Sequence, residues 1–293
     1  MEHKAGFVNI IGNPNVGKST LINAFLNEKL SIVTPKAQTT RHRILGLVNS
    51  EEYQVVFSDT PGIIKPAYEL QNAMMGVVKT AFEDADLLLY LIEIGEKKLK
   101  DEFFLEKIKK ASIPVLIVLN KIDQSEQEKV MQEVEYWSEL IPNAEVFAIS
   151  ALKKFNVEGI FNRIVELLPL CPPYFPKDQF TDRSKRFFVN EKIRERILKN
   201  YQKEIPYSVE VVTESFKEFE DIIRIRAIIY TERKTQKGIL IGHKGKALKV
   251  VGTQARIDLQ TFFRKKIFLE LYVKVDEGWR NNALKIKKFG YHE

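Results

Sequence analysis

The sequence predicts an α/β protein: a domain with a mixed, mostly parallel sheet and helices on both faces, followed by a smaller α+β domain. Three observations lead to this prediction. Short apolar runs alternate with amphipathic ones in the first half of the 293-residue chain. Four prolines then interrupt the pattern between Pro169 and Pro176, and the order of the elements changes after them. Alternation of strands and helices is typical of a mostly parallel sheet covered by helices.

The apolar runs of the first half are expected to be strands, because they are short and rich in Val, Ile, Leu and Phe. They are Phe7–Ile11, Tyr53–Ser58, Asp86–Ile92, Pro114–Leu119 and Glu145–Ile149. Helical patterns lie between and after them, at Ser19–Asn27, Tyr68–Phe82, Asp101–Ala111, Glu126–Leu140 and Val157–Leu168. An extra strand, Ile44–Val48, is expected to pair with Tyr53–Ser58 across the turn Asn49–Glu52.

The prolines mark a boundary, since proline removes a backbone donor and fixes φ, so that neither a helix nor a central strand continues through them. We therefore expect a first domain over residues 1–170, a Pro-rich linker over 171–183 and a second domain over 184–293. In the second domain the order α–β–β–α–α–β is expected. Its elements are a charged helix (Ser184–Lys203), strands Val209–Phe216 and Ile222–Thr231, two helices around a Gly-containing turn, the second at Lys246–Lys265, and strand Ile267–Val275.

Charge divides the chain at the same place. Residues 1–172 hold 19 Lys and Arg against 23 Asp and Glu, whereas residues 173–293 hold 27 against 16. A strongly basic second half indicates a polyanionic partner, with nucleic acid ahead of anionic lipid. The apolar runs are too short to cross a bilayer, and the first residues leave no room for a targeting segment. A single cysteine, Cys171, excludes an intrachain disulfide, and a reducing cytoplasm is the expected location.

A phosphate-binding loop follows the first predicted strand and opens the first predicted helix, which is the context that its motif requires. The motif G-x-x-x-x-G-K-[ST] is matched by Gly12, Asn13, Pro14, Asn15, Val16, Gly17, Lys18 and Ser19, with Thr20 next. Its glycines allow backbone N–H groups to surround phosphate oxygens at a helix N-terminus. Lys18 is expected to reach the β- and γ-phosphates, and the Ser19 hydroxyl to ligate Mg²⁺.

Two further elements are typical of a γ-phosphate sensor. Asp59, Thr60, Pro61 and Gly62 close the third apolar run, where the carboxylate can hold the metal through water and the Gly62 N–H can bond the γ-phosphate. The polar loop Ser31–Arg43 carries two adjacent threonines, Thr39 and Thr40. A threonine hydroxyl here is expected to bind Mg²⁺ only while the γ-phosphate is present, and Thr40 is preferred over Thr39 for this role. Arg41 and Arg43 stay open between contact with nucleotide or RNA and solvation.

The base of the nucleotide is predicted from Asn120, Lys121 and Asp123, which follow a buried strand. A carboxylate at Asp123 accepts from N1–H and the 2-amino group of guanine, which adenine lacks. Asn120 is expected to connect the base edge to the phosphate-binding loop, and the Lys121 stem to pack over the ring. The turn Ser150, Ala151 and Leu152 is expected to bring the Ala151 N–H to guanine O6.

One catalytic residue of Ras-type GTPases has no counterpart. Ras-type GTPases place a Gln directly after D-x-x-G to orient the attacking water. In this sequence the same position holds Ile63. An aliphatic side chain cannot orient water, so catalysis is expected to rest on Mg²⁺, Lys18, Thr40 and the backbone N–H at Gly62. We therefore expect slow intrinsic turnover that rises when the correct RNA or ribosomal particle binds.

The second half carries a G-x-x-G loop between two helices, formed by Gly242, His243, Lys244 and Gly245. Such a loop allows the backbone to approach a nucleic-acid strand closely, as in KH domains. Lys237, Lys246 and Lys249 are close in sequence and add positive charge. With the order α–β–β–α–α–β, these features predict a type II KH fold and RNA binding; no DNA partner is expected.

The motifs together resemble the Era family of bacterial GTPases over almost the whole length. The stretches GNPNVGKST, KAQTTRHRI, DTPGI, NKID and SAL appear in order, followed by GILIGHKGKALK. The resemblance implies GTP hydrolysis coupled to small (30S) ribosomal subunit assembly, with the KH domain on the 3′ region of 16S rRNA. It also implies weak peripheral association with the cytoplasmic face of the membrane, and it explains Ile63, since these GTPases generally lack the Gln.

Two alternatives stay open at this point. The chain could be an RNA-binding module whose nucleotide domain only holds GDP as a structural element, or a membrane-associated regulatory GTPase. Phosphate release with and without rRNA distinguishes the first alternative, because a structural GDP domain releases none.

Overall fold

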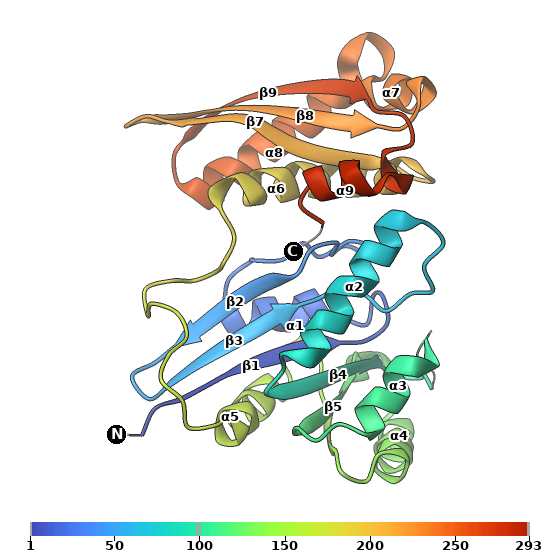
Figure 1. The fold of residues 1–293 in the computed structure, drawn as a ribbon, viewed down its shortest axis with the longest axis vertical. Coiled ribbons are helices and arrows are strands. Elements are labelled where there is room, and N and C mark those ends of the chain that lie inside the picture. Colours follow the sequence, from blue (N-terminus) through green and yellow to red (C-terminus); the bar gives the residue numbers. More distant parts are fainter. Residues whose placement is uncertain (1, 98, 100, 292–293) are drawn as a thin grey trace. The chain divides into compact units, whose positions relative to one another are not determined.

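The computed structural model describes residues 2–97, 99 and 101–291, and it divides into two compact units (Figure 1). Unit 1 comprises Met1–Ala67 and Gln71–Asp182, and unit 2 comprises Tyr68–Leu70 and Arg183–Glu293. Among the described residues, none of the helices is both long and apolar enough to pass through a bilayer.

Unit 1 is built on a six-stranded sheet in the order β2-β3-β1-β4-β5-β6. The strands are β1 (Lys4–Ile11), β2 (Ile44–Asn49), β3 (Tyr53–Asp59), β4 (Leu87–Glu93), β5 (Val115–Asn120) and β6 (Glu145–Ala148). β2 is antiparallel to β3, and the other neighbours are parallel. The predicted mixed, mostly parallel sheet is therefore confirmed, including its extra strand.

Helices cover both faces of this sheet. They are α1 (Lys18–Leu26), α2 (Glu69–Glu83), α3 (Glu102–Lys109), α4 (Gln127–Leu140) and α5 (Val157–Leu167). α1 lies behind the sheet and α2 in front of it (Figure 1). Phe25 of α1 stacks on Phe57 of β3 and also meets Phe161 of α5, so α1 and α5 share one face. The parallel strands therefore end at one common edge, where their following loops meet.

The Pro-rich segment is packed on unit 1 rather than separating the units, which corrects the expectation of a linker over residues 171–183. The Ala5 N–H donates to Pro169 O at 3.1 Å, and the Leu47 N–H donates to Phe180 O at 3.0 Å. The buried side chain of Gln54 donates to Phe175 O and accepts from the Phe175 N–H. The segment is thus held through both its carbonyl and its N–H groups, and Thr181 forms an isolated bridge with Gly46 of β2.

Unit 2 has a three-stranded sheet in the order β7-β8-β9, with β7 antiparallel and β9 parallel to the central β8. Its elements are α6 (Lys185–Asn200), β7 (Val209–Glu218), β8 (Ile222–Thr231), α7 (Lys234–Ile241), α8 (Lys246–Phe263), β9 (Lys266–Val275) and α9 (Ala283–Lys288). The predicted order α–β–β–α–α–β is confirmed, and α9 follows it. α6 ends at Asn200, three residues before the expected Lys203, and Tyr201 takes an extended conformation there.

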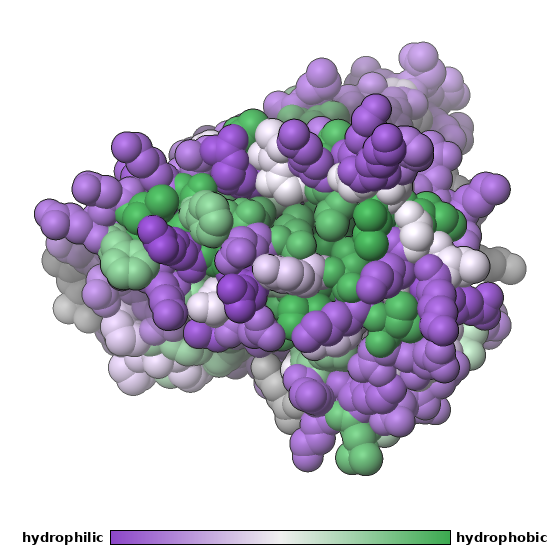
Figure 2. All heavy atoms as spheres, turned by 90° about the horizontal axis from the view of Figure 1, so that it is seen from above, coloured by the Kyte–Doolittle hydropathy of each residue, from purple (hydrophilic) through white to green (hydrophobic). Residues whose placement is uncertain are grey.

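The core of unit 2 lies between one face of the sheet and its helices. Apolar side chains at alternate positions of β8, such as Ile223 and Ile225, pack with Ile193 of α6 and Leu259 of α8, as expected for a sheet covered on one side. Figure 2 views the molecule from the side on which β9 and α7 lie in Figure 1, and it shows hydrophobic side chains in a band bordered by hydrophilic ones. Unit 2 therefore exposes apolar surface as well as charge.

Candidate functional site

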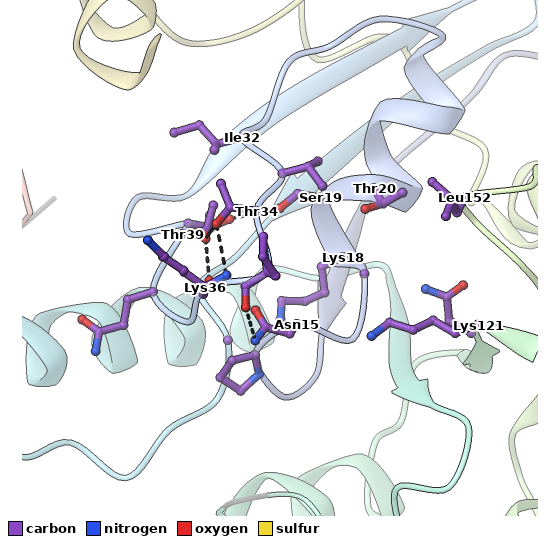
Figure 3. Close-up of a pocket in the computed structure, with 18 of the residues that line it drawn as sticks. Asn15, Lys18, Ser19, Thr20, Ile32, Thr34, Lys36, Thr39, Lys121 and Leu152 are labelled. Atoms are coloured by element: carbon purple, nitrogen blue, oxygen red, sulfur yellow. Dashed lines mark hydrogen bonds between the residues drawn. The ribbon is translucent and has the colours of Figure 1, made fainter. Parts of the chain in front are cut away.

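One cavity of unit 1 brings together the motifs that the sequence singled out. It has a volume of about 480 Å³ and lies where β1, β3, β5 and β6 end. Side chains from α1, from the loop before β2 and from the loops after β5 and β6 surround it (Figure 3). The predicted residues on its wall are Pro14, Asn15, Gly17, Lys18, Ser19, Thr20, Thr40, Thr60, Gly62, Asn120, Lys121, Asp123, Ser150 and Leu152.

The phosphate-binding loop has the shape that its sequence predicts. Gly17 adopts φ 104°, in the left-handed region, and a Cβ atom there would lie 2.3 Å from the Asn120 side-chain nitrogen. Only glycine satisfies both conditions. α1 begins directly afterwards at Lys18, so its unpaired N–H groups and the positive end of its dipole face the cavity.

Lys18 lies inside this loop. Its amino group donates to Gly12 O at 3.0 Å and to Asn13 O at 2.8 Å, and its side chain is buried. Burial lowers the pKa of Lys18 to about 8, and the nearby carboxylates of Asp59 and Glu96 oppose this shift. The amino group is therefore a cation held in a low-dielectric place, where its attraction to a phosphate is stronger than in water.

Three oxygen-bearing side chains predicted to hold a metal converge beside Lys18. The Ser19 hydroxyl donates to Asp59 Oδ2 at 2.8 Å and lies 3.0 Å from the Thr40 hydroxyl. Burial raises the pKa of the Asp59 carboxyl, and the hydrogen bond from Ser19 opposes the shift. The other carboxylate oxygen, Oδ1, is buried and has no hydrogen-bond partner among the described residues. A buried carboxylate with a free oxygen beside two hydroxyls fits a hard cation such as Mg²⁺.

The two candidate threonines differ in their surroundings. Thr39 Oγ1 donates to Lys36 O at 2.6 Å and lies 2.6 Å from Thr34 Oγ1, which keeps it within its own loop (Figure 3). Thr40 instead lies against Ser19 and Asp59. The structure thus places Thr40, the preferred candidate, beside the other proposed metal ligands.

Asn120 connects the loops at the end of the cavity where the guanine base is expected to bind. Its side-chain nitrogen donates to Val16 O at 2.8 Å, and its oxygen accepts from the Ala151 N–H at 2.9 Å. The connection to the phosphate-binding loop is the expected one. The Ala151 N–H, predicted to meet guanine O6, donates to the Asn120 side chain in this structure.

Several partners of the site were absent from the sequence prediction. Glu96 accepts from the Asn13 side chain at 2.5 Å, and Glu93 pairs with the Lys121 amino group at 2.5 Å. Both glutamates stand at or just after the end of β4, at the same sheet edge as the predicted loops. Position at a strand end was the signal that could have found them, although the intervening loop has no motif.

Of the two arginines left open by the sequence, Arg41 is buried and Arg43 is partly buried. Arg41 is 1% exposed. Arg43 donates to Ser58 Oγ at 2.7 Å and pairs with Asp84. Solvation therefore does not describe the Arg41 side chain.

Unit 2 holds the second candidate site, the G-x-x-G loop between α7 and α8. Gly242 adopts φ 71°, and a Cβ atom there would lie 2.6 Å from Ala247 Cβ, so glycine is required. His243, Lys244, Lys246 and Lys249 are exposed, whereas Lys237 is partly buried. The loop therefore presents backbone and positive charge to solvent, as single-strand binding requires.

Comparison with known families supports both units. The family described as "50S ribosome-binding GTPase" matches residues 7–121, and the KH domain family matches residues 204–280. The chain is 45% identical to GTPase Era of Thermoanaerobacter sp. over 99% of this chain and 97% of that protein. It is 43% identical to GTPase Era of Clostridium kluyveri, over 98% and 99% respectively.

Two solved structures are similar over nearly the whole chain. One is Era in complex with MgGDPNP and nucleotides 1506–1542 of 16S ribosomal RNA, with a TM-score of 0.95 and 36% identity, covering 99% of this chain and 100% of that one. The other is a variant of Aquifex aeolicus Era bound to GDP·AlF4⁻, with a TM-score of 0.95, 36% identity and the same two coverages.

Proposed function

The chain belongs to the Era family of GTPases, and from this premise we propose that it is a switch that binds the 3′ region of 16S rRNA through its KH domain and assists assembly of the small ribosomal subunit. The observation that carries the proposal is the exposed, basic G-x-x-G loop of unit 2, present in the same chain as a complete GTPase cavity. The similar structure of Era that contains this RNA region supports the choice of partner.

In unit 1, the proposed roles follow from position. Lys18 stabilises charge on the β- and γ-phosphates, and the backbone N–H at Gly62, on the cavity wall, donates to the γ-phosphate. Ser19, Thr40 and Asp59 would hold Mg²⁺, which supplies charge neutralisation at the phosphates when it is bound with the nucleotide. Asp123 selects guanine, and Asn120 keeps its loop in register with the phosphate-binding loop.

Intrinsic hydrolysis is expected to be slow because no side chain at position 63 reaches the attacking water. The side chain of Ile63 is fully buried and the Ile63 N–H donates to Gly12 O at 3.0 Å, so this position holds the backbone and leaves the attacking water unoriented. We therefore expect the rate of phosphate release to rise when the RNA is bound, with the missing orientation supplied in that complex.

The equilibrium affinity for an RNA oligonucleotide of the 16S 3′ region tests the role of unit 2. Gly242→Asp and Gly245→Asp place negative charge where the RNA backbone is proposed to approach, so each is expected to weaken RNA binding at least tenfold, roughly the effect of losing one good contact. Lys244→Ala should lower the slope of log affinity against log salt by about 0.7, the value for one phosphate contact on a single strand.

Gly76→Asp on α2 is the control for Gly245→Asp, since both glycines have open space around them. It should leave RNA affinity unchanged, and GDP affinity should be the same in all four variants. Unchanged RNA affinity in both loop variants, with folding intact by circular dichroism, would mean that the loop does not bind the RNA.

A further inference from the structure

A second cavity of unit 1 lies beside the nucleotide cavity and is a groove between α4 and the turn after β6. It has a volume of about 1150 Å³. Its apolar wall includes Met131 and Phe155, whose side chains are 64% and 61% exposed. Exposed large apolar side chains that line one groove are typical of a protein interaction site, and Met and Phe are enriched at such sites.

α4 is arranged so that it presents this apolar stripe outward. Met131 and Val134 are spaced as i and i+3 and line the groove together, as residues on one helix face do. The opposite face carries Glu133, which accepts from the Gly95 N–H, and the buried Trp137. Met131 is therefore not a core residue of the helix, and its exposure is a property of the groove.

The charge of the groove defines the partner. Among its described lining residues the charged ones are Glu128 and Glu135, both carboxylates. Two basic neighbours are directed elsewhere: Lys129 lies close to Gly95, and the Lys154 amino group lies 3.4 Å from the Asn27 side chain. An apolar groove with only negative charge attracts a cationic segment that has an apolar side chain, and it repels RNA.

The groove shares two loops with the base end of the nucleotide cavity. Ile122 and Ser125 line the groove, while Asp123 and Gln124 between them line the nucleotide cavity. Phe155 closes the second loop, because its N–H donates to Ser150 O at 3.0 Å and its carbonyl accepts from the Ser150 N–H at 3.2 Å.

This second loop also positions Asn120. Between Ser150 and Phe155 lies Ala151, whose N–H holds the Asn120 side chain, and Asn120 in turn holds Val16 of the phosphate-binding loop. Phe155 is flanked by Lys154 and Asn156, both in the left-handed conformation with φ 56° and φ 55°. This conformation is uncommon for a non-glycine residue.

From these contacts we propose that the groove between α4 and the Ser150–Phe155 loop docks a basic segment of a partner protein, and that its occupation accelerates release of guanine nucleotide. The apolar side chain of the segment packs between Met131 and Phe155, and its cations pair with Glu128 and Glu135. Displacement of Phe155 opens the Ser150–Phe155 loop and releases Asn120 from Ala151. The loops that surround the guanine base are then held less firmly, and the nucleotide is bound more weakly. The inference depends on the GTPase activity of the family and not on the proposed RNA partner.

Linkage makes the proposal quantitative. A segment that weakens GDP binding by some factor must bind the GDP-bound protein more weakly by the same factor. Coupling between sites of one domain is typically about 5–150-fold. We expect GDP affinity of the full-length protein to fall about tenfold at saturating segment, within this range, and GDP release to become faster accordingly.

The test uses the full-length protein loaded with a fluorescent GDP analogue and a nine-residue synthetic peptide with a central leucine and two lysines on each side of it. The peptide should accelerate release of the analogue, and peptides with glutamate for lysine or alanine for leucine should not. The double variant Glu128→Lys/Glu135→Lys should lose the acceleration. Glu139→Lys, an exposed glutamate of the same helix outside the groove, is the matched control and should retain it.

Each other outcome counts against the proposal. Equal acceleration in the double variant would place the peptide elsewhere, and binding without faster release would remove the link to the nucleotide. Failure of the peptide to bind the nucleotide-free protein would remove the docking site. None of these results depends on RNA affinity, so the RNA proposal stands or falls separately.

Discussion

At the scale of single residues, Ile63 shows how position decides chemistry. The sequence identifies it as an aliphatic residue at the place of the Ras-type Gln, and the structure shows that its side chain points into the interior and is 0% exposed. A catalytic side chain has to reach the attacking water. Position 63 is buried and does not line the nucleotide cavity, so a Gln placed there is not expected to orient the water.

Ile63→Gln should consequently leave the rate of GTP hydrolysis within about twofold of the wild type. The variant should also lose about 1–3 kcal/mol of stability, because a buried amide is left without partners. Single-turnover phosphate release and urea unfolding measure the two effects. Ile64→Gln, at a partly exposed neighbour, should lose less stability, and a rise in rate of tenfold in Ile63→Gln would contradict this account.

Asp123 allows a direct test of base selection. It is exposed on the wall of the cavity, and Asp123→Asn replaces an acceptor with an amide that can donate to the 2-oxo group of xanthine. We expect the preference to change from GDP toward XDP by several orders of magnitude, as for sites built to match a hydrogen-bonding group. Competition between the two nucleotides measures it, and an unchanged GDP preference would mean that another group reads the base.

At the scale of elements, one buried side chain binds the middle of the Pro-rich segment after α5. Gln54 of β3 is 0% exposed. It donates to Phe175 O at 2.8 Å and accepts from the N–H groups of Tyr174 and Phe175 at 2.8 and 3.0 Å. An amide is suited to this task because it offers donors and acceptors together. The segment is therefore an ordered part of unit 1.

Gln54→Ala should release this segment. The backbone groups of Tyr174 and Phe175 lose their partners, at a cost of about 1–3 kcal/mol, and limited chymotrypsin digestion should cut faster after these two aromatic residues. Gln179→Ala, which removes a side chain that bonds only within the segment, is the control. Equal digestion of wild type and Gln54→Ala would show that other contacts hold the segment.

At the scale of the whole molecule, β2 links the loop that carries Thr40 to the chain segment that leads into unit 2. The loop that carries Thr40 runs directly into β2 at Ile44. The same strand bonds the end of the Pro-rich segment, since the Leu45 N–H donates to Asp182 Oδ1 at 2.9 Å and Thr181 Oγ1 donates to Leu45 O at 2.6 Å. α6 begins three residues after Asp182. A change in the Thr40 loop thus has a short covalent and hydrogen-bonded path to unit 2.

RNA affinity should accordingly depend on the nucleotide. A ligand shifts an equilibrium only by its differential affinity for two states, so the RNA should bind with different affinity to protein loaded with GDP and with a non-hydrolysable GTP analogue, by about fivefold or more. Thr40→Ala should remove the difference, because the γ-phosphate then no longer orders the loop. Equal affinities in the wild type would remove the coupling between nucleotide and RNA.

The sequence by itself determined the features whose chemistry lies in contiguous residues. The phosphate-binding loop, the Asn120–Asp123 motif, the G-x-x-G loop and the strand–helix alternation depend on local backbone and periodicity, and the predicted fold class was confirmed for this reason. Only the tertiary structure decided which distant side chains complete the site. Glu96 meets Asn13 and Gln54 holds Phe175 across 83 and 121 residues, and such pairs have no local pattern. Packing likewise decided the burial of Arg41 and the hydrogen bond from the Ala151 N–H to Asn120. It brings together groups that lie far apart in the sequence.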